Sequence, residues 1–149
     1  MMAGIRSRNT RPELLLRRAL HARGFRYRLH AGELPGKPDM VFPRRRAVIF
    51  VHGCFWHQHD CHLFRWPGSR EEFWRRKLDR NREVDTRAVN ALSTTGWRVG
   101  VVWECALKGR AKLPLEEVAD RCSAWLVSDS ASLEIRGLPA QSSRTEDPA

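Results

Sequence analysis

The sequence lacks any long hydrophobic segment. No run of 18 or more apolar residues occurs in its 149 residues, which excludes a transmembrane helix. The first ten residues contain neither an apolar core nor a small-residue cleavage pattern, so we expect no secretory signal and a cytoplasmic location. No internal repeat is visible either. With 42% hydrophobic residues, a chain of this length predicts one domain around one core.

Acidic residues are scarce in the first third of the chain. Residues 1–50 contain 12 Lys and Arg against 3 Asp and Glu, whereas residues 101–149 contain 6 against 8. The net charge of +10 indicates a polyanionic partner, most simply nucleic acid, that meets the N-terminal half first. An anionic membrane is the alternative, but no isolated basic amphipathic helix supports it, so we expect no membrane partner. A second alternative is a basic, soluble protein whose charge serves no particular partner.

Three segments have the pattern of helices. The capping-box motif Thr10–Glu13 predicts a helix that runs to about Arg23. A second capping box, Ser69–Glu72, predicts a long helix that ends at Gly96. Leu115–Leu126 has the spacing of a final amphipathic helix.

Four segments have the pattern of strands. Phe25–His30 alternates between apolar and polar residues, and Asp39–Phe42 follows a rigid Pro-Gly turn. Ala47–Val51 is continuously apolar and predicts a central strand covered on both faces, and Trp97–Glu104 predicts another strand. Together with the helices, these strands predict an α/β fold with a mixed central sheet flanked by helices. We expect one domain over residues 1–127 and a flexible tail over residues 128–149.

The chain contains no C-x2-C pair, but Cys54, His59 and Cys61 lie within eight residues of one another. Cys105 follows the Trp97–Glu104 strand. Thiolates with an imidazole suit tetrahedral zinc, and a filled ligand shell makes such zinc structural. It would stabilise a loop without secondary structure of its own. The four ligands expected are Cys54, His59, Cys61 and Cys105.

Other assignments of these residues remain open. His57 and His62 compete with His59 as ligands, and the cysteines alternatively are free buried thiols. Cys122 lies within the last predicted helix, beside apolar residues, and we interpret it as a core residue.

Several acids and histidines are candidates for chemistry. Asp39 opens a strand after a rigid turn, where a carboxylate can bind a hard cation. His52 and His57 lie at the end of the central strand and in the loop, where a histidine can take a proton from metal-bound water. Taken singly, each of these three residues is better explained as a turn or loop residue. Glu13 is alternatively a capping residue, and Asp85 one charge on a solvated helix face.

Large aromatic residues occur inside the polar loop. Phe55 and Trp56 lie between the two histidines, and Trp74 lies near the start of the long helix. Such residues can wedge between base pairs and kink DNA. Alternatively, all three pack into the core of a small domain.

Several motifs in order resemble the very short patch repair endonuclease family. The resemblance extends from about Arg8 to Leu126, and its most specific part is the HGCFWH-x-H-x-C run. The matching segments are Leu34–Asp39, Val48–Cys61, Glu72–Trp74 with Lys77 and Asn81, Gly96–Val99 and Val102–Leu107.

The resemblance implies a restriction-endonuclease-like α/β fold with a zinc-stabilised loop. It also implies a magnesium-dependent nick beside the thymine of a T:G mismatch, the product of 5-methylcytosine deamination. The partner implied is double-stranded DNA with such a mismatch, bound by a monomer at the nucleoid. Mismatch-repair proteins and a cytosine methyltransferase are candidate partners as well.

The resemblance also assigns roles. Asp39 would bind magnesium with the backbone carbonyl of Val51, and His57 would act as general base. The carbonyl role is compatible with Val at a position where related enzymes often carry Thr. The residues that would orient metal-bound water are Glu13, His52 and Asp85. The residues that would intercalate or contact DNA are Phe55, Trp56, Trp74, Lys77 and Asn81. The zinc ligands implied are Cys54, His59, Cys61 and Cys105.

Three other functions remain open. A restriction enzyme of the same fold would cut both strands of an undamaged site. A non-catalytic, zinc-stabilised DNA-binding protein would tolerate loss of Asp39 and His57. An RNA-binding protein would stack bases on Phe55 and Trp56.

Overall fold

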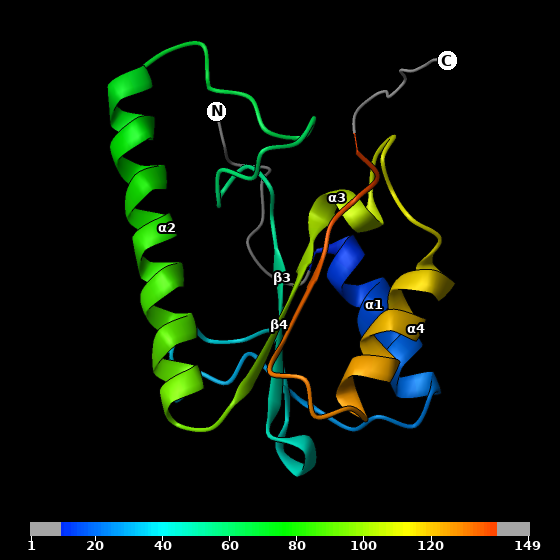
Figure 1. The fold of residues 1–149 in the computed structure, drawn as a ribbon. Coiled ribbons are helices and arrows are strands. Elements are labelled where there is room, and N and C mark those ends of the chain that lie inside the picture. The colour runs from blue at the N-terminus through cyan, green and yellow to red at the C-terminus, as the bar shows by residue number, and fades with distance from the viewer. Residues whose placement is uncertain (1–9, 140–149) are drawn as a thin grey trace, which may run out of the picture.

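A computed structural model describes residues 10–139, which form a five-stranded mixed sheet with helices on both faces (Figure 1). The strands, in sheet order, are β1 (Arg28–Leu29), β2 (Met40–Phe42), β3 (Ala47–His52), β4 (Arg98–Trp103) and β5 (Ser132–Ile135). The helices are α1 (Arg11–Ala22), α2 (Glu71–Thr94), α3 (Glu104–Leu107), α4 (Leu115–Leu126) and the 3-10 turn η1 (Pro43–Arg45). This arrangement confirms the predicted restriction-endonuclease-like α/β fold. None of the helices within residues 10–139 is long and apolar enough to cross a bilayer.

The strand β3 forms the centre of the sheet. It pairs antiparallel with β2 and parallel with β4, and all six of its residues are buried. The helices α1 and α4 pack together on one face, whereas α2 covers the other (Figure 1). Burial on both faces explains why this strand is apolar throughout.

One end of the sheet gathers the candidate residues. The parallel strands β3 and β4 end in register, with His52 opposite Trp103. The segment 53–70, which connects β3 to α2, lies at this same end (Figure 1). In α/β sheets, ligands bind beyond the carboxyl ends of the strands, which is where these segments meet.

The strand predicted for Phe25–His30 is much shorter than expected. Only Arg28 and Leu29 pair with β2, and both are exposed. Phe25 and Tyr27 instead make edge-to-face contacts with Phe42. The alternation therefore reflects packing of these two rings, and β2, with only three residues, offers a short partner.

The two predicted capping boxes have different outcomes. The backbone N–H of Glu13 donates to Oγ1 of Thr10 at 3.4 Å, so Thr10 caps α1 as expected. At α2 the prediction is wrong, because Arg70 is the N-cap residue and no side chain makes a capping hydrogen bond there. Among the apolar residues of α2, Phe73 and Val84 are exposed, whereas Leu78 and Leu92 are buried.

The flexible tail predicted from residue 128 is wrong for Ser132–Ile135. These residues form β5, parallel to β4, and Ile135 is fully buried in the core. The sequence signal, apolar Leu133 and Ile135 around Glu134, is too short to stand out among polar neighbours. Residues 140–149 of the predicted tail lie outside the described residues.

Candidate functional site

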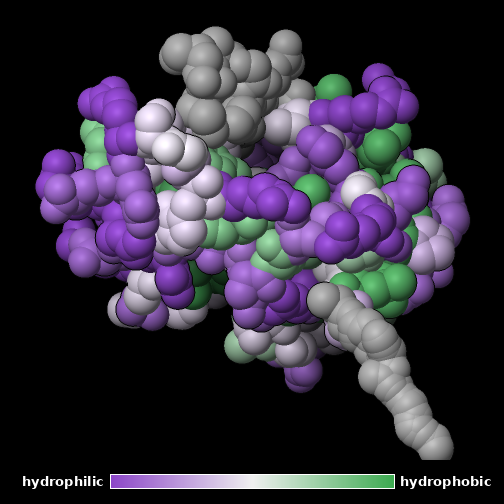
Figure 2. All heavy atoms as spheres, turned by 90° about the horizontal axis from the view of Figure 1, so that it is seen from above, coloured by the Kyte–Doolittle hydropathy of each residue, from purple (hydrophilic) through white to green (hydrophobic). Residues whose placement is uncertain are grey.

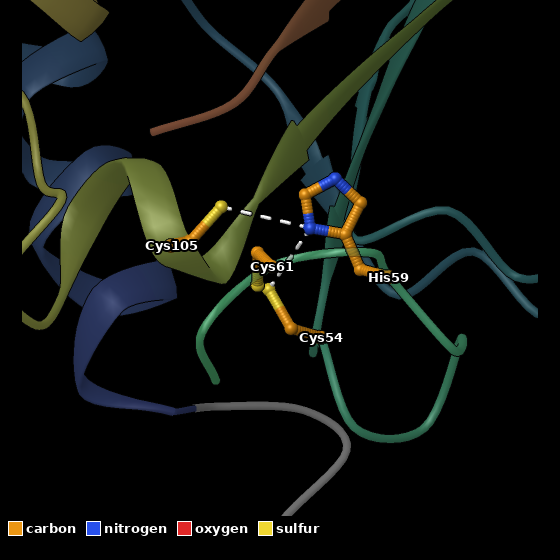
Figure 3. A group of neighbouring side chains, drawn as sticks. All are labelled: Cys54, His59, Cys61 and Cys105. Atoms are coloured by element: carbon orange, nitrogen blue, oxygen red, sulfur yellow. Dashed lines mark hydrogen bonds between the residues drawn. The ribbon is translucent and has the colours of Figure 1, made fainter. Parts of the chain in front are cut away.

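A cysteine–histidine cluster joins the loop to the end of β4. Three members come from the segment after β3, and Cys105 comes from α3. Their side chains point toward one another (Figure 3), and one ligand atom from each lies within 4.8 Å of the others. The members are Cys54, His59, Cys61 and Cys105.

The dimensions of this cluster fit tetrahedral zinc. Nδ1 of His59 lies 3.5 Å from Sγ of Cys54 and 3.6 Å from Sγ of Cys105. Zinc bond lengths of about 2.3 Å to sulfur and 2.0–2.1 Å to nitrogen give a tetrahedral S–N edge of about 3.5 Å. The donor set and these two spacings therefore suit this ion.

The thiols of the cluster share their protons unequally. A hydrogen bond from Cys54 lowers the pKa of Cys105 to about 5. The backbone N–H of Gly137, just after β5, also donates to Sγ of Cys105 at 3.3 Å. The same bond to Cys105 raises the pKa of Cys54, and burial raises that of Cys61. Because zinc binds thiolates, the thiols of the cluster lose their remaining protons when a metal binds.

The competing residues lie elsewhere. Among the described residues, His62 joins no metal-capable group, and His57 belongs to a different one. Cys122 is fully buried on α4, as predicted, and burial raises its pKa to about 12.

Neighbouring strands hold the cluster in place. The ring of His59 stacks on Trp103 of β4, with centroids 4.0 Å apart and planes at 10°. Arg136, which follows β5, binds the carboxylate of Asp60 at 2.8 Å. The loop is therefore held against β4 and β5 as well as through its sulfur atoms.

A second group of side chains surrounds Asp39. This residue precedes β2, is buried, and accepts a 2.6 Å hydrogen bond at Oδ2 from the backbone N–H of Val51. Glu13 reaches the same group from the first turn of α1 and is 1% exposed. Oε2 of Glu13 accepts a 3.1 Å hydrogen bond from Arg17. Two buried carboxylates thus lie together where a hard cation can bind.

His30 is a member of this group that the sequence reasoning missed. Its Nε2 lies 3.2 Å from Oε2 of Glu13, and its Nδ1 lies 3.6 Å from Oδ1 of Asp39. In the sequence it is only the last polar residue of an alternating segment. Its left-handed backbone (φ +47°) turns the chain at the end of β1 and is invisible to periodicity.

A third group contains the two predicted histidines. Nδ1 of His57 contacts Oδ2 of Asp85, which comes from the middle of α2. The ring of His52 lies against that of His57, with centroids 3.9 Å apart. Burial, followed by the nearby imidazoles of His57 and His59, holds the pKa of His52 well below its usual range. His52 is therefore neutral, and His57 is oriented by a carboxylate.

The end of β3 links the second and third groups. Val51, which is bonded to Asp39, and His52 are consecutive residues, so their side chains point to opposite faces of the sheet. His52 and His57 lie at a cavity of about 820 Å³ bounded by α2, β4 and β5. Other lining residues are Asp85, Asn90, Val101, Leu133 and Arg136.

The predicted aromatic wedge forms one cluster. Phe55 contacts Trp56 and Trp74 with ring centroids 5.2 Å and 5.6 Å away, and the two tryptophans lie 6.1 Å apart. All three are half-buried and belong to neither core cluster of the described residues. Asn81 donates from Nδ2 to the carbonyl of Trp56 at 3.2 Å, and Lys77 is exposed.

Known proteins match this chain over most of its length. The family model described as DNA mismatch endonuclease Vsr matches residues 1–63. The DNA mismatch endonuclease Vsr of Escherichia coli (strain K12) is 45% identical over 134 residues, which cover 90% of this chain and 86% of the relative. The chain belongs to the Vsr family of DNA mismatch endonucleases.

Two other relatives extend the comparison. Type II nicking enzyme V.XorIIP of Xanthomonas oryzae pv. oryzae is 49% identical over 122 residues, covering 80% of this chain and 90% of the relative. Type II nicking enzyme V.NmeAIP of Neisseria meningitidis is 42% identical over 111 residues, covering 74% of this chain and 79% of the relative.

The Vsr match and the candidate groups overlap in part. Residues 1–63 include Asp39, His57 and three members of the cysteine–histidine cluster. Asp85 and Cys105 lie beyond that segment and complete their groups only through the fold.

Proposed function

We propose that this Vsr-family chain is a magnesium-dependent endonuclease that nicks DNA beside the thymine of a T:G mismatch. The observation that carries the proposal is the end of β3. There, Val51 fixes the carboxylate of Asp39, and the next residue, His52, packs on the His57–Asp85 pair. A buried carboxylate pair that is linked through the end of β3 to an oriented imidazole suits metal-assisted phosphodiester hydrolysis.

Oxygen ligands near Asp39 suit magnesium. Asp39, Glu13 and the backbone carbonyl of Val51 would hold the ion, because Mg²⁺ prefers carboxylate and carbonyl oxygens. The resemblance implied that Glu13 orients metal-bound water, and its place beside Asp39 supports a role as ligand instead. Bound there, magnesium supplies positive charge that stabilises the phosphate in the transition state. The hydrogen bond from Val51 orients Asp39 before any ion arrives, so less conformational freedom is lost on binding.

His57 would act as the general base. Its contact with Asp85 engages Nδ1, which leaves Nε2 to take the proton from an attacking water. Asp85 therefore acts by holding the tautomer and orientation of the imidazole, a more direct role than the orientation of water implied by the resemblance. Neutral His52 packs against the His57 ring without adding a competing charge.

The aromatic cluster would open the duplex at the mismatch. Phe55, Trp56 and Trp74 lie together at the active end of the sheet, outside the main cores. A T:G pair is more easily unstacked than a normal pair, so the cost of deformation itself discriminates. Asn81 supports the loop through Trp56, and exposed Lys77 is placed to meet a phosphate. Figure 2, a view onto this end, shows a largely hydrophilic face with small hydrophobic patches.

Zinc would be structural, bound by Cys54, His59, Cys61 and Cys105. A shell filled by four protein ligands leaves no position for water, so the cluster holds the loop that carries Phe55, Trp56 and His57. We also propose that the protein acts as a monomer in the cytoplasm, at the nucleoid. Mismatch-repair proteins and a cytosine methyltransferase are its proposed functional partners.

A nicking assay tests this function. Two duplexes differ only by T:G or C:G at one position, and each is incubated with and without magnesium in several flanking sequences. We expect one cut beside the thymine, only in the T:G duplex and only with magnesium. Cleavage of both duplexes in both strands would indicate a restriction enzyme instead. Binding without cleavage in every flanking sequence would indicate a non-catalytic DNA-binding protein.

A further inference from the structure

His30 lies between the two carboxylates of the Asp39 group. Its Nε2 is 3.2 Å from Oε2 of Glu13 and its Nδ1 is 3.6 Å from Oδ1 of Asp39. Its side chain is 15% exposed, that of Glu13 1% and that of Asp39 11%. An imidazole enclosed in this way is a fixed part of the group and not a loop side chain that happens to be near.

The backbone of His30 is held in an uncommon conformation. Its φ of +47° lies in the left-handed region, which costs free energy for a residue with a side chain. The backbone N–H of His30 donates to the carbonyl of Asp39 at 3.1 Å, which ties this turn directly to Asp39. Position 30 therefore has a backbone conformation that favours glycine, yet it carries an imidazole, and this imidazole reaches Glu13.

The carboxylates of Glu13 and Asp39 are brought together from separate elements. Glu13 comes from α1, whereas Asp39 comes from the turn before β2. Arg17 and His30 both contact Oε2 of Glu13, from α1 and from the end of β1. The two contacts help to set the direction of this carboxylate and offset its repulsion from Asp39.

We propose that His30 is a positioning residue of the cation site: its Nε2 donates to Glu13 and keeps that carboxylate facing Asp39. The inference rests on the proposed function, in which Asp39 binds the cation. Hydrogen-bond partners of metal-binding carboxylates affect affinity by roughly 10- to 100-fold. His30 accordingly sets the affinity of the site for a divalent cation.

Manganese binding tests the role of His30 without DNA. Zinc-loaded protein is titrated with Mn²⁺, and free Mn²⁺ is followed by electron paramagnetic resonance. His30→Gly removes the imidazole and suits the left-handed backbone, and we expect it to weaken binding about 10- to 100-fold. His30→Gln places an amide donor near the position of Nε2 and should retain wild-type affinity. If His30→Gly does not fold, His30→Asn tolerates the same backbone, is too short to reach Glu13, and should bind as weakly.

Two controls separate this inference from the proposed function. Asp39→Asn should abolish Mn²⁺ binding, and unchanged binding in that variant would refute the cation site itself. If Asp39→Asn abolishes binding and His30→Gly does not weaken it, only the role of His30 is refuted. Equal weakening in His30→Gln and His30→Gly, with zinc content and circular dichroism intact, would also overturn positioning through a hydrogen bond.

Discussion

The backbone N–H of Val51 donates a 2.6 Å hydrogen bond to Oδ2 of Asp39, twelve residues earlier in the chain. The antiparallel pairing of β2 with β3 ends at Met40 and Ile49, so the ladder does not reach Val51. The carboxylate of Asp39 takes the place of a ladder acceptor there. The side chain of Asp39 therefore satisfies the backbone N–H beyond the end of the β2–β3 ladder and places a fixed carboxylate at the candidate active site.

This dual role predicts different results for two substitutions of Asp39. Asp39→Asn keeps an oxygen for the Val51 N–H, whereas Asp39→Ala leaves that buried donor without its acceptor, at a cost of about 1–3 kcal/mol. We expect both variants to lose nicking and to keep most DNA binding, and only the alanine variant to lose stability. Urea unfolding and a gel-shift assay provide the measurements. Loss of stability together with DNA binding in Asp39→Asn would make Asp39 a folding residue alone.

His57 should be separable from the zinc cluster. Because His57 contacts Asp85 and lies outside the cysteine–histidine group, His57→Ala should lower nicking by about 10²–10⁴-fold and leave zinc in place. Asp85→Asn should lower nicking in the same direction, since the imidazole loses its carboxylate partner. Zinc content is measured by atomic absorption beside the nicking rate. Loss of zinc from His57→Ala would mean that His57 is a zinc ligand and that His59 is not.

The four thiols should differ in their reactivity, with three that zinc protects and one that the core protects. With zinc bound, we expect no rapid reaction with a thiol reagent at pH 8. After removal of zinc by a chelator, the loop loses the restraint that keeps its thiols buried, so Cys54, Cys61 and Cys105 should react. Cys122 should stay slow, because it is fully buried and its pKa of about 12 leaves almost no thiolate at that pH. A count of four rapid thiols after chelation would show that the core around α4 depends on the metal.

The last strand should be needed for stability. Ile135 is fully buried, so Ile135→Ala should lower the free energy of unfolding by about 2–5 kcal/mol. Leu138→Ala is the matched control, because Leu138 is 56% exposed and should change stability little. Denaturant unfolding of both variants gives the comparison. Equal, small effects would mean that β5 contributes little to the core.

The aromatic cluster should matter for mismatch recognition more than for folding. Trp74→Ala removes one ring that contacts both Phe55 and Trp56 and lies outside the main cores. We expect weaker binding to T:G duplexes, a smaller preference over C:G, and a nearly unchanged melting temperature. Fluorescence anisotropy with both duplexes measures the preference. A large fall in melting temperature without a change of preference would assign these rings to packing.

Local sequence patterns were sufficient for several elements. Leu115–Leu126 forms a helix with the predicted bounds, because its apolar spacing is complete within the segment. The strand Ala47–His52 is central, as its continuous apolar run required. The proximity of Cys54, His59 and Cys61 follows from their spacing of a few residues, since a short loop keeps them close.

Other features depend on residues that are distant in the sequence. Asp85 meets His57, 28 residues earlier in the chain, only because α2 packs against the sheet. β5 forms because β4 offers it an unpaired edge, which a four-residue pattern cannot reveal. His30 joins Glu13 and Asp39 through a left-handed turn that no periodicity encodes. The sequence alone thus determined the local elements and the chemistry available, whereas tertiary packing decided which side chains act together, because their contacts join separate elements.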